Sequence, residues 1–152
     1  MPTKAELSYQ VASLEAEIAK LRARDTTPCR TPILAEVEIR KLIHHPEQES
    51  FVALYLDARQ RVILSALVSV GSLSHVDVHP REIFRDAIRI GAHSIIVGHN
   101  HPSGDLSPSD ADVEITKRLV DVGRLVGIPV LDHLIVATPG QCVSLASLGC
   151  LG

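Results

Sequence analysis

The most informative part of the chain for its fold is SIIVGHNHPSGDLSPSDAD, from Ser94 to Asp112. Its first five residues, 94–98, form a short and mostly apolar run that predicts a buried strand. A loop rich in proline, serine and glycine follows over 99–108. Ser109 then precedes a helical pattern that reaches about Leu125, with acidic residues in its first turns, where the helix dipole favours them. This stretch therefore predicts a strand, a compact loop and a capped helix.

Further strand and helix patterns lie on both sides of this stretch. Alternating apolar residues and β-branched content indicate the strands. Pro80 near a first helical position and Gly91 after the last one indicate a second helix. The expected strands cover residues 50–57, 61–70, 130–137 and 143–145, and the second helix covers residues 80–90. Interleaved elements of this kind predict an α/β (α+β) fold, a three-layer sandwich in which helices flank a mixed β-sheet.

The first 25 residues carry a regular apolar repeat. Its members are spaced alternately four and three residues apart, which is the rhythm of the core positions in a short coiled coil. They are Leu7, Val11, Leu14, Ile18 and Leu21. Two and a half heptads form only a marginal helix in isolation, so we expect this helix to pack on something. Two partners remain open, namely the chain's own domain and a second copy in a homodimer.

The chain divides into three expected parts. Residues 25–32 contain two prolines and a cluster of threonines that cannot continue a helix, and residues 34–43 have an ambiguous pattern. We therefore expect an N-terminal heptad helix over 1–25, a linker and lead-in over 26–44, and one globular domain over 45–152. A length of 152 residues fits one domain with a short appendage.

Composition excludes several classes of protein. Aromatic residues make up 3% of the chain and tryptophan is absent, which leaves little material for base stacking. The net charge of −3 gives no excess of positive charge for phosphates, so nucleic acid is not an expected partner. Three cysteines, Cys29, Cys142 and Cys150, are odd in number and far apart, as in free thiols of a reducing compartment. With no secretory signal and no long apolar span, we expect a cytoplasmic location without a membrane partner.

The candidate chemistry lies at the end of the strand in the quoted stretch. His99 and His101 are two residues apart there, so their side chains project to the same side. Asp112 lies in the first turn of the next helix, beyond a loop compact enough to return it to the histidines. Two imidazoles and one carboxylate form an open three-ligand zinc site with a fourth position for water. Zinc lowers the pKa of such a water to about 7, which makes it a nucleophile at neutral pH.

Hydrolysis at such a site also needs a base and a donor for the oxyanion. Ser109, one helical turn before Asp112, is the candidate donor. Serine is also a favoured N-cap, and the two roles can coexist. The base should be a carboxylate from another element. Glu49, at the mouth of the first strand, is the best-placed candidate, and spacing alone leaves Glu47 and Glu82 as alternatives.

His133 is a further histidine in an apolar segment. It follows Asp132 in the predicted strand 130–137. The simplest interpretation is a core histidine that is bonded to a neighbouring group. The alternative is that its ring orients a ligand imidazole through a hydrogen bond.

The combined pattern resembles a known signature. His-x-His, followed after seven residues by Ser-x-x-Asp, is similar to the JAMM (MPN+) metalloprotease motif. The run HNHPSGD over 99–105, with PSDAD over 108–112, resembles the RadC-like family more closely, a family once described as DNA repair proteins. Other segments resemble blocks of the same family, and the resemblance covers roughly residues 45–148. These segments are 49–57, 79–87 and 131–136.

The resemblance implies both a fold and a site. The fold is the JAB1/MPN domain, a mixed sheet with flanking helices. The site holds one zinc ion per chain on His99, His101 and Asp112. Glu49 is then the acid/base and Ser109 assists at the oxyanion. The implied activity is that of a JAMM-type zinc metallopeptidase acting on a protein or peptide substrate at a peptide or isopeptide bond.

Two other functions stand beside this one. The first is a non-catalytic interaction module of MPN type, although such modules usually lack the ligand set that this chain has. The second is a DNA-associated protein, as the old family label suggests. Many RadC-like chains carry a helix-hairpin-helix region ahead of the domain, whereas residues 1–32 here hold the heptad helix and the linker. Together with the net charge, this favours the hydrolase.

Overall fold

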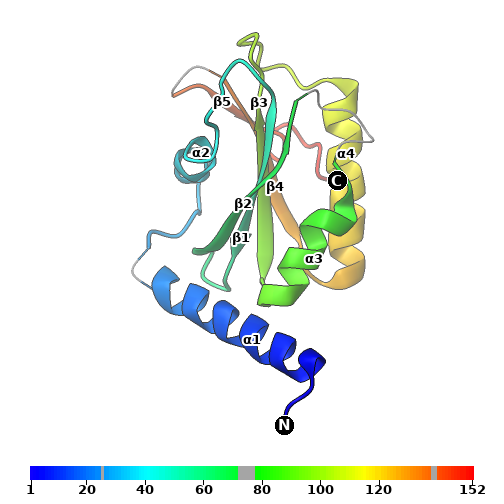
Figure 1. Cartoon of the computed structure of the whole chain (residues 1–152). Helices are drawn as coiled ribbons and strands as arrows, with labels where there is room; N and C mark the ends of the chain where they lie inside the picture. Colours follow the sequence, from blue (N-terminus) through cyan, green and yellow to red (C-terminus); the bar gives the residue numbers. More distant parts are fainter. Residues whose placement is uncertain (25, 72–77, 138–139) are drawn as a thin grey trace.

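One mixed β-sheet forms the centre of the molecule. A computed structural model of the chain describes residues 1–24, 26–71, 78–137 and 140–152. Five strands lie in the order β2-β1-β3-β4-β5, with helices on both faces of the sheet (Figure 1). The strands are β1 (Ser50–Leu56), β2 (Val62–Val70), β3 (Ser94–Asn100), β4 (Val130–Val136) and β5 (Cys142–Ser144). All neighbouring pairs are antiparallel except β3 and β4, which are parallel.

The parallel pair is joined by helix α4 (Asp110–Val126). The helix begins at Ser109, which is its N-cap as the sequence predicts, and ends at Gly127. Gly127 has φ 75°, a left-handed conformation that glycine adopts without steric cost. The connection places the C-terminal end of β3 and the N-terminal end of α4 beside each other, with the loop over 101–109 between them.

Three layers confirm the predicted sandwich. Helix α2 (Pro32–Arg40) covers one face of the sheet, and α3 (Pro80–Ile90) and α4 cover the other (Figure 1). Each face has its own apolar core. The larger core includes Phe51, Ile83 and Leu119, and the smaller one includes Ile39 and Leu54. The architecture is the α/β fold of mixed sheet and flanking helices that the sequence predicts.

Helix α2 lies inside the range expected to be a linker and lead-in, 26–44. Thr31 caps it by accepting a hydrogen bond from the N–H of residue 34, and Pro32 occupies its first turn. Both features are helix-start signals that were present in the ambiguous segment. Ile39, which is 0% exposed, lies over Gly98 of β3, where a methyl group on the glycine Cα would come within 2.5 Å of the Cδ1 atom of Ile39. The close approach of helix and sheet at this point therefore depends on glycine.

The predicted strand at 94–98 is two residues longer in the structure. Strand β3 continues to Asn100, because His99 pairs with Phe51 of β1 and Asn100 pairs with Val136 of β4. The polar residues at this end favoured a loop from position 99 onward. Pairing on both sides instead keeps the first ligand histidine within the sheet.

Helix α1 (Lys4–Ala23) confirms the predicted N-terminal helix. A capping box starts it, since Thr3 accepts from the N–H of Glu6 and the Glu6 carboxylate accepts from the N–H of Thr3. The helix lies across one end of the domain, against α3 and β2 (Figure 1). Asp25, the last residue of the expected range, lies outside the described residues. Within the described ranges, no helix has both the length and the apolar character that crossing a membrane requires.

Candidate metal centre

The structure brings His99, His101 and Asp112 together. One ligand atom from each lies within 4.8 Å of the others. His99 Nε2 is 3.1 Å from Asp112 Oδ1, and His101 Nε2 is 3.1 Å from Asp112 Oδ2. The two Nε2 atoms are 3.0 Å apart. The side chains of His99 and Asp112 are buried and that of His101 is 12% exposed, so the cluster opens to solvent on the His101 side.

Asp112 is held in place by the start of α4. In a capping box, the N–H of Ser109 donates to Asp112 Oδ2 at 2.9 Å, and the N–H of Asp112 donates to Ser109 Oγ at 3.1 Å. The cap thus fixes the direction of the carboxylate toward the histidines. The cap bond uses an acceptor site of the Ser109 hydroxyl and leaves its own hydrogen to donate. The N-cap role predicted for Ser109 is confirmed, and the donor role is compatible with it.

A chain of hydrogen bonds sets the tautomer of His99. The hydroxyl of Thr116 donates to the carbonyl of Asp112 at 2.6 Å, so Thr116 Oγ1 accepts from His133 Nδ1, which lies 2.6 Å away. His133 Nε2 is then an acceptor, and it lies 2.7 Å from His99 Nδ1. His99 Nδ1 carries the hydrogen in this chain, which leaves the lone pair of His99 Nε2 for the ligand cluster.

His133 can serve as acceptor because it stays neutral. The ring is 0% exposed, and burial, followed by the charge of nearby His99, lowers its pKa well below the usual value for histidine. The prediction of a core histidine bonded to a neighbour describes it correctly. The neighbour is His99, a candidate ligand, so this contact is the one through which the alternative would have His133 orient a ligand imidazole.

His101 is fixed in the same tautomer by its own loop. Its Nδ1 lies 2.6 Å from the carbonyl oxygen of Asp105, and a carbonyl only accepts, so Nδ1 donates. Two imidazole Nε2 atoms and a carboxylate therefore face one another at 3.0–3.1 Å as acceptors. Such a group needs a cation among its atoms, either a proton or a metal ion. Two imidazoles and one carboxylate are a donor set that zinc takes in catalytic sites.

The electrostatics of Asp112 agree with a cation at this place. Burial by itself would raise the pKa of its carboxyl group. When the cluster holds a proton in place of a metal, the hydrogen bond and positive charge of His99, together with the bonds from Ser109, outweigh burial and hold the pKa of Asp112 below its usual range. The carboxylate is therefore ionised at neutral pH and suited to bind a cation.

Glu49 immediately precedes β1, the strand that pairs with β3. Phe51 of β1 pairs with His99 of β3 in antiparallel register, and their rings stack with centroids 6.1 Å apart. The carbonyl of Glu49 accepts from the N–H of Gly71 at 2.8 Å, which continues the pairing of β1 with β2 by one residue. Continued by two residues, the β1–β3 register would bring Glu49 level with His101 and onto the face of Phe51, because strand side chains alternate.

The two alternative carboxylates are placed less favourably. The side chain of Glu47 is 70% exposed, and its Oε1 lies 3.5 Å from Nδ1 of His45. Glu82 lies in the first turn of α3 and is exposed. Neither position follows the continued register that would bring Glu49 level with a ligand histidine.

Asn100, between the two ligand histidines, has a role that sequence analysis missed. Its side chain points to the opposite face of β3. The residue as a whole is 5% exposed. The amide Nδ2 donates to the carbonyls of Pro46 and Gln48 at 3.3 Å and 2.9 Å, and Oδ1 accepts from the N–H of Ser50 at 2.7 Å. One side chain thus holds the segment that carries Glu49. No local sequence signal indicates these bonds, which join positions about fifty residues apart.

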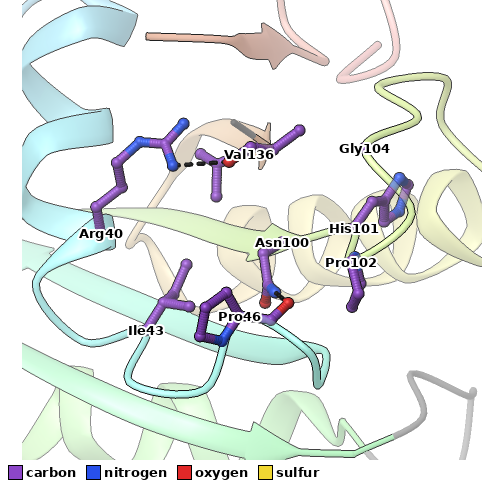
Figure 2. A pocket seen from close by; sticks show the side chains of 9 residues that line it. Arg40, Ile43, Pro46, Asn100, His101, Pro102, Gly104 and Val136 are labelled. Carbon is purple, nitrogen blue, oxygen red and sulfur yellow. Dashed lines mark hydrogen bonds between the residues drawn. The ribbon is translucent and has the colours of Figure 1, made fainter. Parts of the chain in front are cut away.

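A pocket of about 450 Å³ lies between α2 and the end of β3, and His101 is the one residue of the cluster that lines it (Figure 2). His101 lies on one side of it and Arg40 on the other. The Arg40 guanidinium donates to the carbonyls of Ala137 and Gln141 and pairs with Glu36 at 2.6 Å. Most of the remaining wall is apolar, from Ile43, Pro46, Pro102, Val136 and Ala137. Asn100 lines the pocket as well, so the pocket lies mainly on the α2 side of the sheet.

A mixed sheet between helical layers, with two strand-end histidines and a helix-cap aspartate converging at one end, defines a JAB-type α/β domain with a candidate metal centre. The chain belongs to the family described as RadC-like JAB domain, whose sequence profile matches residues 32–150. The matched range includes α2, both ligand histidines and Asp112.

Several curated relatives carry the name UPF0758 protein. One from Bacillus cereus (strain 03BB102) is 44% identical over 131 residues, which cover 86% of this chain and 55% of the relative. One from Thermosynechococcus vestitus is 40% identical over 135 residues, covering 89% of this chain and 54% of the relative. One from Finegoldia magna is 58% identical over 90 residues, covering 59% and 40%. The chain thus spans about half the length of the curated relatives it matches.

Proposed function

We propose that this chain is a zinc-dependent hydrolase of JAMM type that cleaves a peptide or isopeptide bond in a protein or peptide substrate. The observation that carries the proposal is the convergence of the Nε2 atoms of His99 and His101 and both carboxylate oxygens of Asp112, at 3.0–3.1 Å. The hydrogen bonds of both Nδ1 atoms direct the Nε2 lone pairs toward this point. One zinc ion per chain fits this donor set.

Each residue around the cluster has a distinct part in the proposed reaction. A bound zinc ion would supply Lewis-acid activation of water and of the substrate carbonyl. Glu49 accepts a proton from the attacking water and delivers it to the leaving amine nitrogen as the carbon–nitrogen bond breaks. The Ser109 hydroxyl donates to the carbonyl oxygen as negative charge develops there.

The ligand set favours a hydrolase over an interaction module. A module that only binds a partner has no need of two histidines held in one tautomer with a carboxylate ionised beside them. A DNA-associated function is less favoured because the chain has a net charge of −3 and few aromatic residues.

Metal content of the full chain tests the centre directly. We expect protein purified without added zinc to contain about one zinc per chain and Asp112→Ala to contain none, since a three-ligand site does not survive loss of its carboxylate. Asp110→Ala is the matched control, because Asp110 is an exposed acidic residue of the same first turn. Circular dichroism shows whether each variant is folded. Folded wild-type protein that takes up no zinc would overturn the proposal.

Glu49→Gln tests the base separately from the metal. We expect this variant to keep zinc and to lose turnover by roughly 10²–10⁴-fold, the usual contribution of general acid–base catalysis. Glu47→Gln, two residues away in the same segment, should keep both. The assay is cleavage of a peptide and isopeptide substrate library with chelator controls. Full activity of Glu49→Gln would assign the base to another residue.

A further inference from the structure

The apolar repeat of α1 faces solvent. We call Leu7, Val11, Leu14, Ile18 and Leu21 the heptad stripe. Its five residues are between 46% and 59% exposed. Large apolar side chains that gather along one helix face in this way mark an interaction surface more often than isolated exposed residues do.

A different face of α1 holds the helix to its own domain. Ala16 and Ala23 are buried there, and Ala19 packs against the same core. Glu15 adds an ion pair to Arg89 of α3 at 3.0 Å. Ala16 lies about 200° around the helix from residue 14, because each residue turns the helix by about 100°. Contact with the domain therefore uses mainly the small residues and leaves the heptad stripe about half exposed.

We propose that the heptad stripe is the seam of a parallel, two-stranded coiled coil with a second copy of this chain. The spacing assigns Val11 and Ile18 to the a positions of the heptad and the three leucines to the d positions. β-Branched residues at a with leucine at d are the combination that favours two parallel strands over higher oligomers. The stripe thus carries the side chains that this partner requires.

Charge beside the seam favours the same partner and direction. Glu17 and Arg22 are exposed and occupy g and e positions on the two sides of the stripe. In a parallel pair, Glu17 of each copy faces Arg22 of the other, so the ion pair forms twice. An antiparallel pair with full overlap is centred on Leu14 and instead brings Glu17 of one copy near Gln10 of the other, which forms no ion pair.

The dimer leaves both candidate metal centres accessible. α1 contacts the domain near Ile63 and Leu64, at the start of β2, whereas the ligand histidines lie at the C-terminal end of β3 (Figure 1). β2 and β3 both pair with β1 in antiparallel register, which puts these two places at opposite ends of the sheet. Dimerisation through the seam therefore gives one particle with two open sites.

Sedimentation equilibrium of the full chain tests the seam. Because two and a half heptads associate weakly, the measurement extends to about 100 µM. We expect a mass of two chains for the wild type and one chain for Leu14→Glu, whose residue is 59% exposed and so is not needed for folding of the domain. Tyr9→Glu is the matched control, because Tyr9 is 77% exposed on the same helix outside the stripe. A monomeric wild type, a dimeric Leu14→Glu or a monomeric Tyr9→Glu would each overturn the proposal.

Cysteine cross-linking tests the direction of the strands. In a background in which Cys142 and Cys150 are replaced by serine, Leu7→Cys chains should join to one another on mild oxidation, since equal d positions face each other in a parallel pair. Leu21→Cys chains should do the same. Cross-links that form only when the two kinds of chain are mixed would show an antiparallel pair and overturn the parallel arrangement.

Discussion

Replacement of His133 by phenylalanine should weaken metal binding without opening the core. Phenylalanine keeps a ring of similar size against Phe51, whose centroid lies 5.5 Å from that of His133, and removes both nitrogens. His99 then has no acceptor for its Nδ1–H in a place where it is 0% exposed. Without metal, the hydrogen of His99 can move from Nδ1 to Nε2 and form a hydrogen bond with Asp112. The free-energy cost of an unpaired Nδ1–H therefore arises only when a metal ion binds Nε2.

The size of the expected loss in zinc affinity follows from the buried Nδ1–H of His99 that is left without an acceptor. A buried N–H without an acceptor costs about 1–3 kcal/mol. Loss of a group that orients a metal-bound histidine lowers metal affinity by about 10- to 100-fold, which is about 1.4–2.7 kcal/mol. The two estimates agree. Thr116→Val should act in the same direction and more weakly, because it removes only the bond that sets the tautomer of His133.

Competition with a chromophoric chelator measures the dissociation constant for zinc. Tyr55→Phe is the control, since the Tyr55 hydroxyl donates to the carbonyl of Ile83 at 2.9 Å within the same core and touches no ligand. It should lower the free energy of unfolding by about 1 kcal/mol and leave zinc affinity unchanged. Zinc affinity of His133→Phe within twofold of wild type would refute the assigned role of His133.

The same variant should change the pH dependence of stability. The pKa of His133 lies well below its ordinary value in the folded chain, so at mildly acidic pH the unfolded chain binds one proton that the folded chain does not. Stability then falls by about 1.4 kcal/mol per unit as pH drops below about 6.5. In the metal-free chain, denaturant unfolding of His133→Phe should show a slope smaller by this amount between pH 6 and pH 5. A slope equal to that of the wild type would contradict the assignment of His133 as a neutral buried ring.

Three further predictions concern other parts of the fold. Asn100→Ala should lower the free energy of unfolding in urea by about 1–3 kcal/mol, because the buried N–H of Ser50 loses its acceptor. The same variant should retain zinc and show reduced turnover. Burial raises the pKa of both Cys29 and Cys142 to about 11. At pH 8 each thiol should therefore react with a thiol reagent about a hundredfold more slowly than an unstructured cysteine. Faster reaction would contradict the burial of these two side chains. Gly98→Ala should destabilise the chain by about 1–3 kcal/mol, since the buried side chain of Ile39 leaves no room for a methyl group, and unchanged unfolding would show that α2 can shift.

Local sequence patterns predict most of the helices and strands and the three candidate metal ligands. A serine cap with acidic residues behind it starts α4, and a short apolar run marks β3, because caps and strand patterns depend on neighbours a few residues away. The positions of His99, His101 and Asp112 follow from this local geometry, so their spacing was enough to predict the cluster. The start of α2 was also encoded locally, in Thr31 and Pro32, although its apolar pattern was too short to indicate a helix.

Long-range packing brings distant residues to the cluster and so sets which of them support it. His133 reaches His99 across 34 positions, and Asn100 reaches the segment of Glu49 across about fifty. It also decided that α1 packs by its alanines and leaves the heptad stripe exposed, where the sequence left both partners open. These contacts depend on sheet register, strand order and helix packing, which arise from many weak interactions spread over the whole chain. A local pattern shows which donor and acceptor atoms a residue has. The partners of these atoms depend on the register and strand order of the assembled sheet.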